Sequence, residues 1–280
     1  INKISFNYKY IENTSDIIQA TKPIINLTSK EIENGKSLLI KLGVTSSSKF
    51  ICFHARDSLF LDKTIPEVDW SYHNYRDSSI QNYIPAMEFL SDKGFHCLRM
   101  GSIVKDKFIT NKKNEIVDYS LSDYRSEFMD VYLSANCKFF IGSDCGITCI
   151  PEVFRVPCVY VNWVNIRRIS NWVINGLFIF KKVYSKKYQR FLKFSEIIDL
   201  DIDNQNVRAD MQIELLENTP EEIQEVANEM NERLNNNWQS NAEDELLQKK
   251  FWSLFGNQYI KSENLRIGQH FLKHNINLLI

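Results

Sequence analysis

The chain has 280 residues, of which 44% are hydrophobic and 25% are charged, and these proportions are ordinary for a globular protein of one large domain or two modest ones. Its formal net charge is -1, so no overall positive field attracts nucleic acid, and we expect no nucleic-acid partner. No apolar run reaches the length that spans a bilayer, and the first residues lack the apolar core of a signal peptide, which predicts a cytoplasmic protein.

The cysteines and histidines do not form a recognisable disulfide or metal framework. Four of the six cysteines lie in apolar, strand-like runs, where cysteine behaves as a small buried hydrophobe. Cys145 and Cys149 are four residues apart, but no histidine nearby completes a zinc set. His270 and His274 have the same spacing, again without an adjacent third ligand. The sequence therefore predicts no metal site.

The amino-terminal part of the chain predicts little regular structure before one helix. Residues 1–27 alternate weakly and predict a single strand or an irregular entry segment. The helix that follows has Thr28 as its cap, Glu31 completing a capping box and Gly43 at its end. We take residues 1–45 as an amino-terminal segment and linker helix.

The first buried strand, residues 50–53, delivers charged residues at its carboxyl end. Arg56 and Asp57 follow it closely. A planar guanidinium fixed at a strand end donates to two phosphate oxygens at once, which suits a diphosphate ligand. The alternative is that Arg56 and Asp57 merely form a surface ion pair.

A long polar segment follows at residues 59–77. Segments of this length with little apolar periodicity are usually functional or disordered, and clustered aromatic residues argue against disorder. Aromatic faces interleaved with polar groups suit a sugar or a nucleotide base. The side chains concerned are Trp70, Tyr72, His73, Asn74, Tyr75, Arg76 and Asp77.

Helices and strands then alternate. A helix capped by Ser78 or Ser79 runs to Gly94, and the strand after it delivers a second basic residue, Arg99, at its end. A short strand at 116–119 and a helix at 126–135 follow. This alternation predicts an α/β fold with a Rossmann-like, doubly wound parallel sheet.

The stretch from 137 to 163 predicts a strand, a polar elbow, a short helix capped by Thr148 and a second strand. Ligands of open parallel sheets bind beyond the carboxyl ends of the strands, where this elbow lies. Gly142 and Gly146 allow close approach of a ligand, and Ser143 and Asp144 supply polar groups. The alternative is that the elbow is an ordinary turn, since short glycine motifs are common.

Residues 153–195 contain no acidic side chain. This pattern predicts an anionic substrate mouth, a contact of residues 163–194 with the inner membrane surface, or a solvated basic face over an aromatic cluster. We favour the substrate mouth, because no regular helical amphipathicity is present. The basic residues include Arg167, Arg168, Lys181, Lys182, Lys186, Lys187, Arg190 and Lys193.

The remaining chain predicts helices whose apolar stripes belong to the core. One begins at Thr219, with a proline at its first position, and ends near Leu234. Two more are predicted at 244–255 and 267–279. We take residues 46–200 as the Rossmann-like domain and 201–280 as a carboxyl-terminal helical extension.

Taken together, the motifs resemble a family of bacterial glycosyltransferases associated with surface-polysaccharide biosynthesis. The resemblance covers roughly residues 28–280, and its motifs are fairly specific as an ordered set. The segments that carry it are TSKEIENGKSLLIKLGV, FICFHARDSLF, HNYRDSSIQNYIPAMEFL, FHCLRMGS, FFIGSDCGITCIPEVFRVPCVYVN, FLKFSEII, TPEEIQEVANEMNERL, FWSLF, RIG and FL.

The family is similar to enzymes of the GT-B type, in which two Rossmann-like domains face across a cleft. This resemblance implies that the chain holds the donor-binding domain with its terminal helices, and that the first domain is short or missing. It implies transfer of a sugar from a nucleotide-sugar donor to a saccharide or lipid-linked acceptor, with no cofactor. A contact with the membrane periphery remains compatible with it.

The resemblance also implies roles for individual residues. Arg56, Arg99 and Ser143 would bind the donor diphosphate, and Asp144, Gly146 and Glu152 would line the nucleotide or sugar pocket. Asn74, Arg76 and Asp77 would contact the sugar or the acceptor, with Asp57 or His73 as the catalytic base. Without a DxD motif, the leaving diphosphate would be stabilised by arginines and backbone N–H groups, which predicts metal-independent transfer.

Two other classes of function are weighed against this one. A non-catalytic nucleotide or carbohydrate-binding module would keep the pocket and show no turnover. A dehydrogenase or methyltransferase of Rossmann type would carry GxGxxG after its first strand, where this chain has His54-Ala55-Arg56-Asp57.

Overall fold

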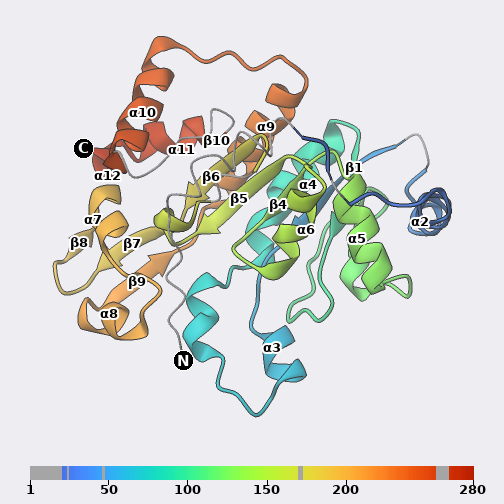
Figure 1. Ribbon diagram of the computed structural model, residues 1–280, viewed down its shortest axis with the longest axis horizontal. Helices are drawn as coiled ribbons and strands as arrows, with labels where there is room; N and C mark the ends of the chain where they lie inside the picture. The colour runs from blue at the N-terminus through green and yellow to red at the C-terminus, as the bar shows by residue number, and fades with distance from the viewer. Residues whose placement is uncertain (1–20, 24, 46–47, 170–172, 257–264) are drawn as a thin grey trace.

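The computed structural model of the chain describes residues 21–23, 25–45, 48–169, 173–256 and 265–280. Its centre is a seven-stranded sheet in which every neighbouring pair is parallel, with the order β10-β6-β5-β4-β1-β2-β3 (Figure 1). The predicted parallel α/β sheet is confirmed. Its strands are β1 (Lys49–His54), β2 (Phe95–Arg99), β3 (Ile116–Val117), β4 (Phe140–Gly142), β5 (Cys158–Trp163), β6 (Gly176–Phe180) and β10 (Leu265–Ile267).

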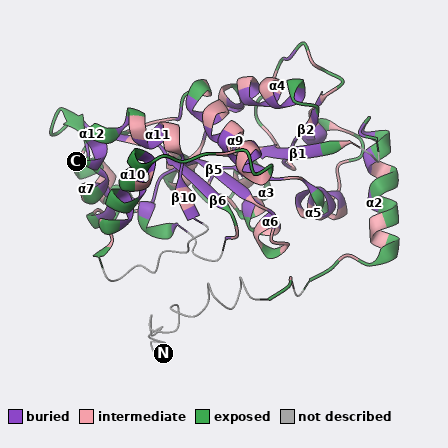
Figure 2. Cartoon of the chain, turned by 90° about the horizontal axis from the view of Figure 1, so that it is seen from above, coloured by how far each residue is buried: buried purple, intermediate pink, exposed green. Residues whose placement is uncertain are grey.

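Helices cover both faces of this sheet, as a doubly wound fold requires. Figure 2 shows α4 and α9 above the strands and α5 and α6 below them. The helices are α2 (Ser29–Lys41), α3 (Leu59–Thr64), α4 (Ile84–Asp92), α5 (Glu127–Asn136), α6 (Cys149–Val153), α7 (Phe194–Asp199), α8 (Gln205–Asp210), α9 (Pro220–Leu234), α10 (Ala242–Ser253), α11 (Gln269–His274) and α12 (Ile276–Leu279). Among the described residues, none of these helices combines the length and apolar character needed to cross a membrane.

The strand order reverses between β1 and β4. From β1 the chain builds outward through β2 and β3, and it then returns to the other side of β1 to add β4, β5 and β6. The connections on the two sides of this point therefore diverge, and open α/β sheets bind ligands beyond the strand ends at such a reversal.

The sheet is buried throughout its middle, because parallel strands are covered on both faces. All six residues of β5 and all five of β6 are buried. The ring of Phe180 packs against the rings of Phe194, Phe251 and Phe271, with centroids 5.8, 5.6 and 6.0 Å away. These contacts bind the carboxyl-terminal helices to the end of β6.

The carboxyl-terminal region, predicted to be helical, also contains the strands β9 (Ile213–Leu216) and β10. A continuous helix was expected over 267–279, but Leu265–Ile267 forms β10, which pairs with Gly176–Phe178 of β6, and α11 begins at Gln269. Sheet pairing here overrides helical periodicity. The region 201–280 therefore supplies an edge strand as well as helices, and the domain boundaries at 45 and 200 remain predictions.

Beyond β6 the chain continues into a small antiparallel sheet. It has the order β8-β7-β9, formed by β7 (Lys182–Ser185), β8 (Arg190–Phe191) and β9 (Ile213–Leu216). Figure 1 shows this sheet beside α7 and α8, at the left of the view.

The predicted helix caps are mostly confirmed. Thr28 and Thr219 each accept a hydrogen bond from the backbone three residues on, within complete capping boxes. Thr148 is the exception: its side chain makes no cap and donates instead to the Cys145 carbonyl, at 2.6 Å. The helix there begins as a 3₁₀ turn, η5 (Gly146–Thr148), so the threonine lies inside the turn.

The linker helix α2 packs closely on α5 through one glycine. A methyl group added at Gly35 would lie 2.1 Å from Cδ2 of Tyr132, far inside contact distance. We predict that Gly35→Ala lowers the free energy of unfolding by about 2 kcal/mol, despite the helix propensity of alanine. Chemical denaturation checks this, with exposed Ser37→Ala on the same helix as the control. Equal stability of the two variants would contradict the close packing.

Candidate functional site

Two predicted site residues meet beyond the carboxyl ends of the neighbouring strands β1 and β4. The backbone N–H of Arg56, two residues beyond β1, donates to Oγ of Ser143, one residue beyond β4, at 3.2 Å. Both residues are buried. Gly142 lets the η5 turn fold back onto β4, because a methyl group there would lie 2.6 Å from the side chain of Thr148. The elbow is thus built around the reversal of strand order.

A 3₁₀ turn, η2 (Ser71–Arg76), is joined to the same strand ends by ion pairs between side chains. Arg56 makes an ion pair with Asp77, directly after the turn, and NH1 of Arg76 lies 3.9 Å from Oδ2 of Asp144. The Arg56 side chain is only 7% exposed. Two arginines and two carboxylates from the predicted set therefore form one cluster.

Burial and crowding of like charges set the electrostatics of this cluster. The pKa of Arg56 is lowered by burial and then by the neighbouring Arg76 cation. Burial raises the pKa of the Asp144 carboxyl, with Arg76 acting in the opposite direction. Two cations that repel each other in a partly dry site gain most from a doubly charged anion such as a diphosphate.

Lys181 belongs to this cluster although the sequence indicated it only as part of a basic stretch. It follows β6 directly, is 4% exposed, and its Nζ donates to the backbone carbonyl of Asp77. Burial lowers the pKa of its ammonium group, and Arg56 lowers it further. Its position after a buried strand is the same signal that identified Arg56.

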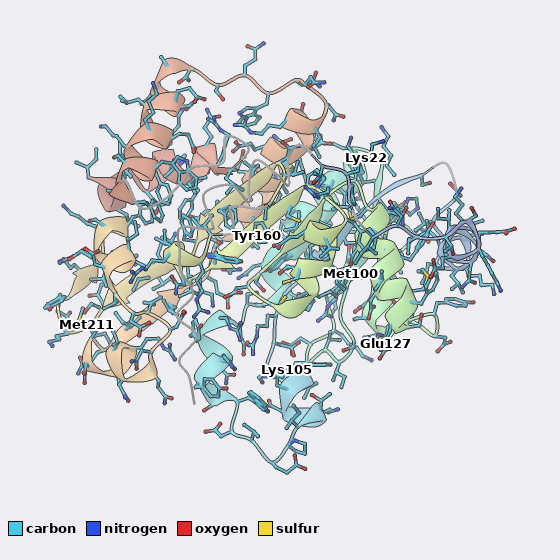
Figure 3. All side chains as sticks on the ribbon, in the orientation of Figure 1. Lys22, Met100, Lys105, Glu127, Tyr160 and Met211 are labelled. Atoms are coloured by element: carbon cyan, nitrogen blue, oxygen red, sulfur yellow. The ribbon has the colours of Figure 1, made fainter. Side chains whose placement is uncertain are left out.

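The two predicted catalytic bases have different surroundings. Both carboxylate oxygens of Asp57 accept backbone N–H groups at 3.0 Å, from Leu59 and from Lys105, the latter labelled in Figure 3. Asp57 therefore ties two loops together. His73 has a buried Nδ1 without a hydrogen-bond partner. Its pKa is lowered by burial and then by Arg76, so the neutral, basic form dominates at neutral pH.

A second histidine lies at the carboxyl end of β1. Nδ1 of His54, the last residue of β1, is 3.1 Å from the carbonyl oxygen of Met100. Burial alone would lower the pKa of His54, but a hydrogen bond with the Cys145 thiol and the Met100 carbonyl raise it overall. Burial would likewise raise the pKa of Cys145, yet His54 and the Thr148 backbone lower it. This pair fastens the elbow to β1.

The side chain of Arg99 does not join the cluster of Arg56, Arg76 and their carboxylate partners. Its side chain is 2% exposed, and its NH1 donates to the Asp118 carboxylate at 3.2 Å and to the backbone carbonyl of Asp106. The guanidinium also lies over the Phe108 ring, 5.8 Å from the centroid. Through these contacts Arg99 binds the loop that follows β2 and the residue that follows β3.

The other predicted residues have different surroundings. Glu152 on α6 accepts a hydrogen bond from the hydroxyl of buried Tyr160, which lies on β5 and is labelled in Figure 3. Gly146 is exposed, with open space where a side chain would begin. Asn74 is exposed on the η2 turn. Their predicted ligand contacts remain predictions.

The basic stretch does not form the continuous positive face that its sequence indicated. Lys182 pairs with Glu222, Lys186 with Glu214, Arg190 with Glu196 and Arg168 with Asp203, at 2.6 to 3.2 Å. Acidic partners from outside the stretch thus pair with four of its basic side chains, which a local count of charges cannot reveal. The predicted membrane contact gains no support from this arrangement.

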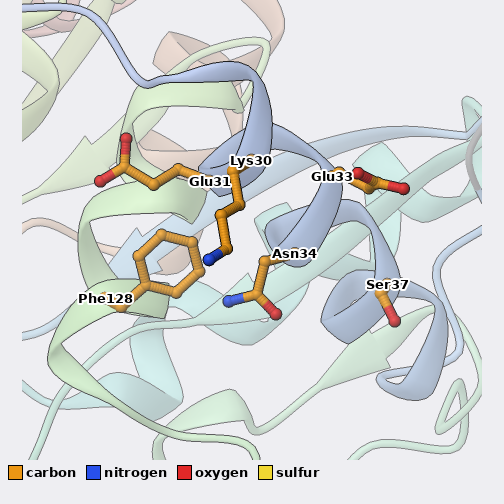
Figure 4. A pocket seen from close by; sticks show the side chains of 6 residues that line it. All are labelled: Lys30, Glu31, Glu33, Asn34, Ser37 and Phe128. Carbon is orange, nitrogen blue, oxygen red and sulfur yellow. The ribbon is translucent and has the colours of Figure 1, made fainter.

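A pocket of about 480 Å³ lies elsewhere, between α2 and α5 (Figure 4). It is shallow and is lined by Lys30, Glu31, Glu33, Asn34, Ser37 and Phe128. None of these belongs to the cluster at the strand ends, and several are solvated charges of α2. We give this groove no role in the chemistry.

Metal ligands are not gathered in the part of the chain that the structure describes, where no group of three or more His, Cys, Asp or Glu side chains could hold an ion. The rings of His270 and His274 stack at 3.8 Å, and Nδ1 of His274 is bonded to the His270 carbonyl. Their spacing thus reflects local helix packing.

Comparison with known proteins gives one similar structure. No family model and no curated protein matches the chain. The similar structure is a variant of the wall teichoic acid polymerase TagF, with a TM-score of 0.37 and 10% sequence identity. The match covers 81% of this chain and 52% of that one, so this chain spans about half its length. The functional conclusion therefore rests on the residues of the site.

The placement of Arg99 generates a stability prediction. Arg99→Met would leave the Asp118 carboxylate and the Asp106 carbonyl without their buried donor, so we expect a loss of roughly 3 kcal/mol in the free energy of unfolding. Arg167→Met, which changes an exposed arginine, should cost less than about 0.5 kcal/mol. Thermal and urea unfolding measure both. A fully stable Arg99→Met protein would show that the arginine is free for a ligand.

Proposed function

We propose that the chain is a glycosyltransferase module that binds the diphosphate of a nucleotide-sugar beyond the carboxyl ends of β1 and β4. The observation that carries this proposal is the convergence of Arg56, Arg76 and Lys181 on the point where the strand order reverses. Phosphate groups are the ligands for which such a site is best suited, since charge-assisted hydrogen bonds from arginine are strong and directional.

The leaving group explains why cations are needed. When the glycosyl bond breaks, the diphosphate gains negative charge, and fixed donors already in place stabilise that charge without reorganisation. Arg56 and Arg76 would hold the diphosphate oxygens, and Ser143 Oγ and the backbone of the elbow would add neutral donors. The transfer is proposed to need no metal, because the chain's own cations supply the positive charge.

His73 is the proposed general base for the acceptor hydroxyl. It lies on the same turn as Arg76, and its lowered pKa keeps the imidazole neutral near pH 7. Asp57 is the weaker proposal, since both of its oxygens already accept backbone hydrogen bonds. Asp144 and Glu152 would contact the nucleotide or sugar hydroxyls, and Asn74 the acceptor.

The acceptor is proposed to be a saccharide or a lipid-linked saccharide of bacterial surface-polysaccharide synthesis. This part rests on the resemblance of the sequence motifs. A non-catalytic binding module of the same fold would bind the donor identically, so turnover distinguishes the two.

A binding panel tests the proposal directly. Thermal shift with UDP-, GDP-, ADP- and CMP-sugars should identify one nucleotide that stabilises the protein, because a ligand of the native state raises the melting temperature. For that nucleotide, Arg56→Met should weaken binding roughly tenfold to a hundredfold, and Arg167→Met should not. Undiminished binding by a folded Arg56→Met protein would refute the proposed site. Release of free sugar or transfer to an acceptor then separates enzyme from binding module.

The ion pair between Arg56 and Asp77 predicts that a substitution of Asp77 strengthens donor binding. Asp77 occupies the guanidinium that the donor is proposed to use, and its charge repels phosphate. Asp77→Asn should therefore tighten binding of the nucleoside diphosphate, by about tenfold. Isothermal calorimetry measures this, with exposed Asp201→Asn as the control. Weaker binding would mean that Asp77 orients Arg56 rather than competing for it.

The pH dependence of kcat/KM for sugar transfer tests whether His73 is the general base. Because the pKa of His73 is lowered from 6.5, the neutral base persists as pH falls, and kcat/KM should decline only below that value. His73→Gln should remove this acidic limb together with most of the rate, roughly a hundredfold. An unchanged limb in the variant would exclude His73 as the base.

A further inference from the structure

The η2 turn is too short to fix its own conformation. It has six residues, and 3₁₀ geometry gives weaker hydrogen bonds than an α-helix does. Its flanking backbone bonds are few, such as Asp77 N–H to the Asn74 carbonyl at 3.0 Å. Side chains placed to within a fraction of an ångström, as catalysis needs, therefore depend on contacts from outside the turn.

One carboxylate supplies the centre of those contacts. Asp203 lies between α7 and α8, and its side chain is 16% exposed. Oδ1 accepts the hydroxyl of Tyr75, in the turn, at 2.9 Å. Oδ2 accepts Nδ2 of Asn165 at 2.6 Å and lies 2.9 Å from NH2 of Arg168. The turn is thereby fastened to the segment that follows β5.

Arg208 of α8 completes the clamp. Its NH1 donates to the backbone carbonyl of Asp203 at 2.8 Å, and its NH2 donates to the carbonyl of Tyr72 at 3.1 Å. Its guanidinium carbon lies 4.3 Å from the centroid of the Tyr75 ring. Burial and the Asp203 hydrogen bond raise the pKa of Tyr75 to about 12, so the hydroxyl keeps the proton that it donates.

The geometry points to Asp203 as a positioning residue that holds the η2 turn over the strand ends, so that His73 and Arg76 face the bound donor. This inference deepens the proposed function and rests on it for the roles of those two side chains. Asp203 does not touch the reacting groups in this assignment. It acts through Tyr75 and through the Arg208 clamp, and it makes the region 200–210 part of the active-site architecture.

Three variants separate this role from general stability. Asp203→Asn keeps the shape but places an amide donor against Asn165 and Arg168. Tyr75→Phe removes only the hydroxyl. Asp201→Asn is the matched control, because Asp201 lies in the same segment, is exposed, and has no side-chain bond in the structure's described residues.

The first measurement needs no substrate. Trypsin cleavage after Arg76, followed by mass spectrometry under native conditions, reports how often the turn opens, since cleavage tracks the population of the open form. We expect Asp203→Asn and Tyr75→Phe to be cleaved there about tenfold faster than Asp201→Asn, with equal melting temperatures. Equal cleavage rates in all three variants would overturn the inference.

The second measurement follows the His73 ring by NMR, with His73→Gln assigning its signal among the five histidines. Arg76, Arg56 and Arg208 lower the pKa of His73 and Asp203 raises it. Asp203→Asn should therefore lower that pKa further, whereas Tyr75→Phe should leave the charge balance unchanged. An Asp203→Asn protein whose His73 titrates as in the parent would place Asp203 away from the turn in solution.

The third measurement uses transfer. Asp203→Asn and Tyr75→Phe should reduce kcat by about tenfold and should weaken donor binding less than Arg56→Met does, because Arg76 lies on the turn whereas Arg56 and Ser143 belong to other elements. If no nucleotide-sugar binds the parent protein, the proposed function fails while cleavage and titration still test the clamp. If the parent transfers sugar and both variants keep its kcat, the clamp has no positioning role.

Discussion

The reversal of strand order between β1 and β4 is the constraint on which the candidate site depends. A parallel sheet must carry each connection over one of its faces, and open α/β sheets bind their ligands beyond the strand ends where the connections part. At this point the backbone N–H of Arg56 and the hydroxyl of Ser143 join the two strand ends at 3.2 Å. Everything else in the cluster, including the η2 turn and Lys181, is arranged around this bridge.

The sequence predicted β1 to β5, because these strands appear as apolar runs of strand length, but it did not predict β6, which lies within the stretch that was interpreted by its basic residues. It also predicted that Arg56, Ser143 and Asp144 lie together, because each follows such a run. It failed where pairing competes with periodicity: β10 has only three residues, and its apolar spacing also fits the start of a helix.

The contrast between Arg56 and Arg99 shows the limit of position as a signal. Both follow buried parallel strands, yet one pairs with a carboxylate next to the η2 turn and the other with Asp118 and a loop carbonyl. Which partner each arginine finds depends on loops far along the chain, and no local pattern contains that information. The same reason explains why Asp203 could not be recognised: its partners Tyr75 and Asn165 come from two distant segments.

The pairing of β10 with β6 has a consequence for how the chain is made. The edge of β6 presents unpaired backbone groups until residues 265–267 have left the ribosome, although the strand itself is complete nearly ninety positions earlier along the printed sequence. An unpaired, fully apolar edge of this kind is a template for association with other chains. The synthesis of residues 181–264 is therefore an interval in which the nascent protein needs protection from association with other chains.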